Sequence, residues 1–286
     1  MQLSLIYHCG AGRGDHNPED LRRRLEACGH RVRAQDRKDP AFPPLLREPA
    51  EAIIVAGGDG TVADVIRRIP NRDLPLGILP LGTANNIAAS FGIVGEIEQI
   101  AARWERASPR SLDLFEVIGP WGRHLLIESL GLGSLALAQK RARAENLPEG
   151  REIAAARRAL RETLAEARAQ PVRLYADGRD IGGDLLCLEC LNIARMGPGL
   201  TMAPEADPGD GKLDILAVRE AGRAALLDWL DDPALSPCPL PALRAHDVRL
   251  EWNDGVLRLD DEFPERWSEQ VTVRIRHAGQ TARILA

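Results

Sequence analysis

The sequence predicts an α/β N-terminal domain built on a parallel sheet, followed by a mostly β second domain that folds as a sandwich. In the first third, apolar runs alternate with helix-like segments, which is typical of a parallel sheet covered by helices. In the remainder, short strand-like runs recur around Asp-Gly turns, which is typical of antiparallel sheets. We assign residues 1–109 to the first domain and 110–286 to the second, because the pattern changes near residues 108–111. The sequence leaves open whether the last strand returns to the first domain.

The elements of the first domain follow from local signals. Asn17 is a suitable N-cap, Pro18 suits the first helical position, and Gly29 suits the position just past a helix end. The expected strands are residues 2–7, 30–35, 52–56 and 74–80, and the expected helices are 18–28, 61–69 and 84–91. Ligands of such folds bind at the carboxyl ends of the strands.

The second domain begins with a strand pair that turns around residues 119–122, whose sequence is GPWG. Two helical segments follow, and the second of them is amphipathic, with Ala, Leu and Ile on one side and Arg and Glu on the other. The expected helices are residues 135–145 and 151–169, and the expected strand-rich stretches are 171–194, 212–220, 246–262 and 271–279.

Net charge, apolar runs and cysteine positions argue against several classes of protein. The formal net charge is -5, which argues against a dedicated nucleic-acid binder. The absence of an apolar run of about 18 residues argues against a membrane span, and the N-terminus does not resemble a signal peptide. Cys187 and Cys190 form a C-x-x-C, but their apolar surroundings favour buried thiols over zinc ligands and a reducing, cytoplasmic setting. Three basic clusters, at residues 22–24, 140–143 and 157–161, could dock on an anionic membrane, although solvated helix faces are the simpler interpretation.

Residues 53–66, IIVAGGDGTVADVI, carry the strongest functional signal. The loop that follows the apolar run contains three glycines, Gly57, Gly58 and Gly60. Glycines let the backbone approach a ligand closely, and the helix expected from Thr61 onwards points its free N–H groups and dipole at the same place. Such an arrangement predicts a phosphate site, to which Thr61 can add a hydroxyl. Asp59 is a poor phosphate ligand because of its charge, so we expect its partner to be a metal ion or a hydroxyl group.

Two further loops have the same strand–loop–helix form. One contains Gly82 and Thr83 within LGTANN, and the other contains Gly10, Ala11 and Gly12 within GAGRG. The three loops could converge on one polyphosphate, although each taken alone is also compatible with an ordinary tight turn. None of them matches the Walker A pattern.

Four stretches resemble the diacylglycerol kinase catalytic-domain family, which includes bacterial lipid kinases and sphingosine and ceramide kinases. They are GGDGTV at 57–62, PLGTANNIA at 80–88, APEADPGDGKLDI at 203–215 and LRLDDEF at 257–263. That family is similar in outline to NAD kinases and phosphofructokinases. The resemblance implies a nucleotide-binding α/β domain, a β-sandwich domain, and an active site in the cleft between them.

The resemblance also implies roles for particular residues. ATP phosphates would meet residues 57–61, Thr83 and the first loop, whereas Mg²⁺ would bridge the phosphates beside Asp59. The general base would be Asp260 or Glu262, whose roles the sequence does not separate, and a structural Mg²⁺ would bind Asp207, Asp210 and the carbonyl of Lys212. Three residues depart from the family pattern. The first loop reads HCGAG, Asn86 stands where an aspartate is common, and Asp261 stands where a glycine is common.

The predicted function is an ATP-dependent lipid kinase that transfers the γ-phosphate to a lipid hydroxyl such as that of diacylglycerol. The alternatives are a soluble kinase for a sugar, NAD or similar molecule, and a non-catalytic nucleotide-binding regulator. The expected partners are ATP, Mg²⁺, a lipid substrate and, transiently, a membrane surface, with no nucleic acid and with a homodimer left open. We expect the protein in the cytoplasm or at the inner face of the membrane.

Overall fold

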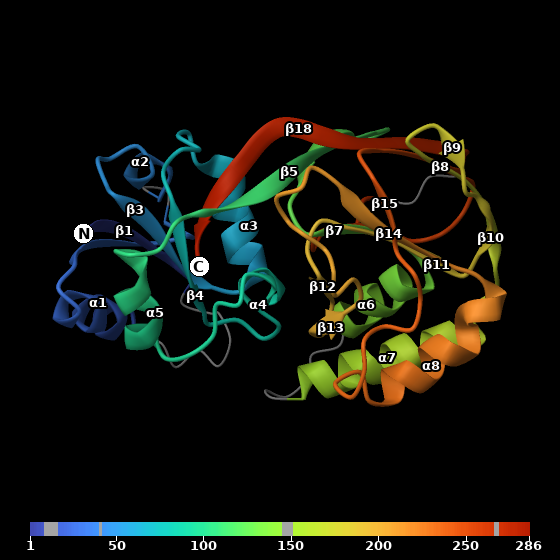
Figure 1. The fold of residues 1–286 in the computed structure, drawn as a ribbon, viewed down its shortest axis with the longest axis horizontal. Helices are drawn as coiled ribbons and strands as arrows, with labels where there is room; N and C mark the ends of the chain where they lie inside the picture. The colour runs from blue at the N-terminus through green and yellow to red at the C-terminus, as the bar shows by residue number, and fades with distance from the viewer. Residues whose placement is uncertain (9–16, 40–41, 145–150, 266–268) are drawn as a thin grey trace. The chain divides into compact units, whose positions relative to one another are not determined.

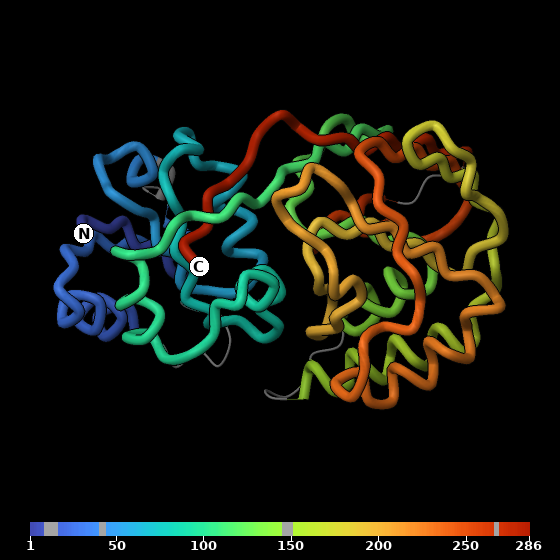
Figure 2. Tube along the Cα trace, in the orientation of Figure 1, coloured from blue at the N-terminus to red at the C-terminus, as the bar shows by residue number. Residues whose placement is uncertain are grey.

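The computed structural model describes the chain except for residues 9–16, 40–41, 145–150 and 266–268. It divides into two compact units (Figure 1). Unit 1 comprises Met1–Leu112 and Gln280–Ala286, and unit 2 comprises Asp113–Gly279. The tube in Figure 2 shows the C-terminal segment lying within unit 1, beside strands from the first third of the chain.

Unit 1 is built on a parallel sheet, which confirms the predicted α/β fold class. Its strand order is β2-β1-β3-β4, and the end of β18 pairs in parallel with β4. The strands are β1 (Gln2–Tyr7), β2 (Arg31–Asp36), β3 (Ala52–Gly57), β4 (Leu76–Pro80) and β18 (Val271–Leu285). Every residue of β3 is buried, because this strand lies in the middle of the sheet. All carboxyl ends of β1–β4 therefore meet at one edge.

The helices of unit 1 connect these strands, and their ends follow the predicted signals. They are α1 (Pro18–Ala27), α2 (Phe42–Leu45), α3 (Asp59–Arg68), α4 (Asn86–Ser90) and α5 (Ile97–Trp104). The side chain of Asn17 accepts a hydrogen bond from the Glu19 N–H at 2.9 Å, and Gly29 adopts a φ of 88° just past the end of α1. Helix α3 begins at Asp59 rather than at the predicted Thr61, because Gly58 already serves as its extended N-cap.

Unit 2 contains two antiparallel sheets, which confirms the predicted mostly β second domain. The first runs in the order β10-β8-β16-β18, with β5 paired to β18 and β6, and β9 paired to β8. Its strands are β5 (Arg110–Gly119, which begins in unit 1), β6 (Gly122–Leu126), β8 (Gln170–Ala176), β9 (Arg179–Asp180), β10 (Gly183–Leu185), β16 (Asp247–Trp252) and β18.

The second sheet of unit 2 has the order β15-β14-β11-β7-β17. Its strands are β7 (Ser129–Gly133), β11 (Cys187–Leu191), β14 (Leu213–Val218), β15 (Leu243–Ala245) and β17 (Leu257–Leu259). A separate short pair is formed by β12 (Arg195–Met196) and β13 (Leu200–Thr201).

The two sheets of unit 2 share one apolar core, to which Phe115 of β5, Leu250 of β16 and Leu188 of β11 contribute. The other face of the second sheet packs on a layer of helices (Figure 1). The helices of this unit are α6 (Ser134–Ala144), α7 (Glu152–Glu166), η1 (Glu220–Gly222) and α8 (Arg223–Asp231). None of the described helices has both the length and the apolar character required to cross a bilayer.

The two cysteines of the C-x-x-C lie in β11 and belong to different apolar clusters. Cys187 packs in the cluster beneath the helices, and Cys190 packs in the core between the sheets. Their side chains leave opposite faces of the strand because successive residues alternate. Burial raises the pKa of the Cys187 thiol to about 12 and that of the Cys190 thiol further. Two thiols on opposite faces of one strand do not form a chelate for zinc.

Candidate functional site

The two described glycine loops of unit 1 lie against each other at the carboxyl edge of the sheet. β3 and β4 are parallel neighbours with Gly57 opposite Pro80, so both loops leave the sheet at the same level. A methyl group on Gly82 would lie 2.3 Å from the Cα of Gly58. One on Gly57 would lie 2.8 Å from the Thr61 side chain. Only glycine permits this approach, so these glycines are required by the packing of two loops as well as by any ligand.

Gly60 has a different position from the other two glycines of its sequence motif. The sequence predicts it in the loop before the helix, but the structure places it inside α3, as the second residue after the Gly58 N-cap. The expected loop position of Gly60 is therefore wrong, because Asp59 already has helical conformation. Gly60 is half-buried, and its N–H belongs to the first turn, whose amides have no partner within the helix. Its contact with an ATP phosphate stays a prediction, now through a helix N-terminus.

Asp59 joins the two loops. Its Oδ2 accepts a hydrogen bond from the Asn86 N–H at 2.8 Å, and its Oδ1 accepts one from the Ile87 N–H at 2.9 Å. These amides are at the start of α4, where a carboxylate also interacts favourably with the helix dipole. A carboxylate among glycines therefore has a structural explanation that the sequence did not supply. A role of Asp59 towards Mg²⁺ remains a prediction.

The second loop is closed by the side chain of Asn85. This residue has a φ of 51°, its Oδ1 accepts from the Gly82 N–H at 2.9 Å, and its Nδ2 donates to the Gly82 carbonyl at 2.6 Å. Of the two hydroxyl groups predicted to meet phosphate, Thr83 is exposed, whereas Thr61 is only 4% exposed and packs beside Gly57. Thr83 is consequently the better placed of the two to reach a ligand.

The third predicted loop, Gly10–Gly12, lies outside the described residues. The residue two positions before it, His8, donates its N–H to the Ala56 carbonyl at 3.2 Å and so continues β1 along β3. Arg37 and Lys38 follow β2 at the same edge. Burial, and then the positive charges of Arg37 and Lys38, lower the pKa of His8. The two cations favour an anionic ligand here, and we did not predict them because DRK after a strand resembles an ordinary polar loop.

We expect Asp59→Asn to lower the free energy of unfolding by about 1–2 kcal/mol, the usual cost of losing a helix cap. Asparagine has one side-chain oxygen, so one of the two amides of α4 would face an NH₂ group instead. Urea unfolding measures the effect. Asp64→Asn is the control, because Asp64 on the same helix makes only solvent-accessible ion pairs among the described residues, with Arg68 at 2.7 Å and with Arg37 at 3.7 Å, and should change stability by less than about 0.5 kcal/mol. Equal stability losses in the two variants would contradict the capping role of Asp59.

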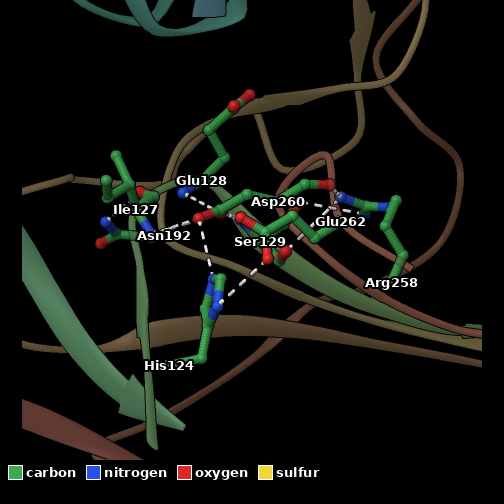
Figure 3. Close-up of polar contacts among 8 residues, drawn as sticks. All are labelled: His124, Ile127, Glu128, Ser129, Asn192, Arg258, Asp260 and Glu262. Atoms are coloured by element: carbon green, nitrogen blue, oxygen red, sulfur yellow. Dashed lines mark hydrogen bonds and ion pairs between the residues drawn. The ribbon is translucent and has the colours of Figure 1, made fainter. Parts of the chain in front are cut away.

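In unit 2, the carboxylate of Asp260 is held by backbone amides. Asp260 follows β17, is 3% exposed and has a φ of 50°. Its oxygens accept hydrogen bonds from the N–H groups of Ile127 at 3.1 Å, Glu128 at 2.7 Å and Ser129 at 3.1 Å (Figure 3). Charge-assisted bonds of this kind are strong. Asp260 is therefore an anchor between the turn after β17 and the chain entering β7.

Arg258 and Glu189 form a buried pair behind this anchor. Arg258 donates through Nη1 to the carbonyl of Asp260 at 2.7 Å, and through Nη2 to Ser129 Oγ at 3.0 Å and to Glu189 Oε2 at 2.7 Å. The bond to the Asp260 carbonyl supports the left-handed backbone there. A side chain at Gly131, opposite Arg258 on β7, would meet Glu189 Oε1 at 2.7 Å, so a glycine makes room for the pair. No feature of the sequence indicated this pair.

The Glu189 carboxyl predicts a pH dependence of stability. Desolvation raises its pKa from 4.5 to about 7, against the opposing charge of Arg258. Between these values the unfolded chain releases a proton that the folded chain retains, so rising pH favours unfolding. Relative to Glu189→Gln, the free energy of unfolding of the wild type should fall by at most about 3 kcal/mol from pH 4.5 to pH 7. If the free energy of unfolding changed with pH equally in the wild type and in Glu189→Gln, the pKa of Glu189 would not be raised.

Glu262 lies in a different environment from Asp260, although the two are separated by one residue. Its side chain is 63% exposed. Between the two carboxylates lies His124 of β6, with Nε2 at 3.6 Å from Asp260 Oδ2 and Nδ1 at 3.8 Å from Glu262 Oε2 (Figure 3). The structure thus brings both predicted acidic residues together and adds a histidine that no sequence motif indicated. Within the run GRHLL it looked like one more residue of a strand.

The residues predicted to bind a structural Mg²⁺ form a compact loop. Asp207 Oδ1 accepts from the Gly209 N–H at 3.1 Å, and Asp210 Oδ1 accepts from the Lys212 N–H at 2.9 Å. No group of three or more His, Cys, Asp or Glu side chains suited to a metal occurs in the described ranges. Two carboxylates and the Lys212 carbonyl are nevertheless the oxygen donors that Mg²⁺ prefers, so the residues fit this ion.

Comparison with known proteins assigns the chain to a family. Residues 2–117 match the family described as diacylglycerol kinase catalytic domain, and residues 129–259 match the YegS C-terminal NAD kinase β-sandwich-like domain. A diacylglycerol kinase of Mycobacterium tuberculosis is 32% identical over 184 residues, which are 62% of this chain and 58% of that protein. A protein of Pseudomonas putida named as a probable YegS-like lipid kinase is 34% identical over 167 residues, covering 57% of this chain and 54% of its own. The alignments thus span little more than half the length of these relatives.

Solved structures show the same fold at lower identity. The crystal structure of a diacylglycerol kinase from Bacillus anthracis superposes with a TM-score of 0.73 at 17% identity, covering 99% of this chain and 96% of that one. An NAD kinase from Archaeoglobus fulgidus, in complex with ATP, superposes with a TM-score of 0.56 at 12% identity, covering 100% of this chain and 94% of that one. The two domain matches, over residues 2–117 and 129–259, show that the chain belongs to the family in which a diacylglycerol kinase catalytic domain precedes a YegS-type β-sandwich domain.

Proposed function

We propose that this protein is an ATP-dependent kinase that transfers the γ-phosphate to a lipid hydroxyl such as that of diacylglycerol. The observation that carries the proposal is the contact of two glycine loops at the carboxyl edge of the unit 1 sheet, joined by Asp59. Such an edge offers backbone N–H groups and the positive end of a helix to a polyphosphate. The names of the relatives favour a lipid as the acceptor.

On the nucleotide side, the chain supplies positioning and charge complementarity, which are the main requirements of phosphoryl transfer. The N–H groups at the start of α3, that of Gly60 among them, would face the phosphates, and the exposed Thr83 hydroxyl would donate to one of them. Mg²⁺, when bound to the phosphates, would neutralise charge that develops during transfer. Because both oxygens of Asp59 already accept amide hydrogen bonds, we assign it a contact with Mg²⁺ through water. The loop of Asp207, Asp210 and the Lys212 carbonyl would hold a separate, structural Mg²⁺.

On the acceptor side, we assign the proton acceptor to Glu262. Its carboxylate is exposed, whereas that of Asp260 is buried and engaged by three amides. The acceptor oxygen would attack the γ-phosphorus while its proton passes to Glu262, and the bond from that phosphorus to the bridging oxygen would break to release ADP. Asp260 would hold the turn that carries Glu262.

The proposal includes transient contact with an anionic membrane surface. The ion pairs indicate which basic residues remain available for this contact. Each of the three arginines at 22–24 pairs with an acidic side chain, and so do Arg158 and Arg161. Lys140 and Arg141 of α6 are exposed and have no ion-pair partner among the described residues. We assign the contact to these two, each with an expected contribution of about 1 kcal/mol.

A transfer assay with γ-labelled ATP, Mg²⁺ and a total bacterial lipid extract tests the function. We expect label in the organic phase with the wild type and much less with Asp59→Asn, whose loops would be loosened. If label entered only water-soluble products, the acceptor would be a soluble molecule such as a sugar or NAD and not a lipid. ATP binding without any transfer would identify a nucleotide-binding regulator and contradict the proposal.

A further inference from the structure

His124 is placed between a fixed carboxylate and an exposed one. It belongs to β6, opposite Val117 of β5, and its side chain is 11% exposed. Its ring nitrogens face the Asp260 and Glu262 carboxylates at 3.6 and 3.8 Å (Figure 3). The ring thus has one side against a carboxylate that three backbone amides hold and the other against the Glu262 side chain, which is 63% exposed.

Hydrogen bonds to both the side chain and the backbone hold Asp260 in place. Three backbone amides hold its carboxylate, and Arg258 holds its carbonyl at 2.7 Å. The strand that carries His124 is likewise fixed, since β6 pairs along its whole length with β5. The ring therefore has a defined orientation, and in the imidazolium form each ring nitrogen carries an N–H. One N–H then faces the Asp260 carboxylate and the other faces the Glu262 carboxylate.

We propose that His124 is a positioning residue that holds the Glu262 carboxylate in the orientation in which it accepts the acceptor proton. The inference rests on the proposed function, in which Glu262 accepts the proton of the hydroxyl that receives the phosphate. An exposed glutamate has several rotamers of similar energy, and a misplacement of about 1 Å can cost roughly 100-fold in rate. The ring restricts Glu262 to the rotamers that face it.

The expected result is a selective loss of turnover. In His124→Ala, kcat for label transfer should fall by about 10- to 100-fold while KM for ATP stays unchanged, since the nucleotide loops belong to unit 1. Imidazole in the buffer should restore part of kcat by occupying the space of the missing ring. His246→Ala is the matched control, because His246 also lies beside an aspartate of unit 2, with Nδ1 at 3.5 Å from Asp177 Oδ2. Its kcat should remain that of the wild type, and both variants should retain the wild-type melting temperature within a few degrees.

A double variant shows whether His124 acts through Glu262. If it does, His124→Ala combined with Glu262→Gln should be no slower than Glu262→Gln alone. Wild-type kcat in His124→Ala, or a double variant that loses the product of the two single effects, would overturn the inference while leaving the proposed function in place. A wild type that transfers no label to any acceptor would contradict the proposed function, and the inference would fail with it.

Discussion

Asp260→Asn is expected to lower the free energy of unfolding by about 3 kcal/mol and to abolish most of the turnover. The buried carboxylate accepts from the amides of Ile127, Glu128 and Ser129. Asparagine provides one oxygen, so at least one buried N–H would lose its partner, at about 1–3 kcal/mol, and the charge assistance would be lost from the others. Asparagine tolerates the left-handed backbone as well as aspartate does, so the effect isolates the hydrogen bonds.

Asp261→Asn provides the matched control for this prediction. It is the same chemical change one residue later, on a side chain that is exposed, where substitutions usually change stability by less than about 0.5 kcal/mol. Urea unfolding of both variants measures the difference. If Asp260→Asn were as stable as Asp261→Asn, the amide cradle would not be the reason for a buried aspartate at this position.

Gly82→Ala is expected to weaken ATP binding by roughly tenfold or more and to destabilise the protein by about 1–3 kcal/mol. The added methyl group would lie 2.3 Å from the Cα of Gly58, a backbone atom that no side-chain rotation can clear. The two loops must separate, and the Asp59 bonds that span them must lengthen or break. Calorimetric titration with a non-hydrolysable ATP analogue measures the affinity.

Two neighbouring variants are expected to have smaller effects on ATP affinity and stability than Gly82→Ala. In Gly58→Ala the new methyl would lie 3.1 Å from the Cα of Gly82, so a smaller shift accommodates it and a smaller loss is expected. Thr83→Ala removes an exposed hydroxyl and should leave stability unchanged while weakening binding only modestly. An affinity for Gly82→Ala equal to that of Gly58→Ala would show that the close approach of the loops does not govern nucleotide binding.

The sequence predicted those parts of the site that depend on local pattern. Alternating strands and helices imply a parallel sheet, and a parallel sheet places the loops after β3 and β4 at one edge, so the loops that contain Gly58 and Gly82 could be placed together before their contact was known. The helical position of Gly60 was missed, because glycine is a poor helix former and its neighbours suggested a longer loop. The partner of Asp59 could not be predicted either. The amides that bind Asp59 belong to residues 27 and 28 positions later in the chain, and their position depends on how α4 packs.

The surroundings of Asp260 depend on strand register, which alternating hydrophobicity does not specify uniquely. Antiparallel pairing of β17 with β7 sets Leu259 opposite Leu130 and so brings Asp260 beside the amides of residues 127–129. The family pattern treats Asp260 and Glu262 alike. The left-handed backbone at Asp260 ends the strand there, and the two carboxylates consequently have opposite environments, 3% exposed for one residue and 63% for the other side chain.

We propose that the chain transfers phosphate with Glu262 as the proton acceptor and with a separate set of residues binding ATP. The most direct measurement is label transfer by Glu262→Gln at saturating ATP, with ATP affinity measured on the same preparation. We expect wild-type affinity for ATP and a loss of turnover of about 100-fold or more. Wild-type turnover in this variant would contradict the proposal.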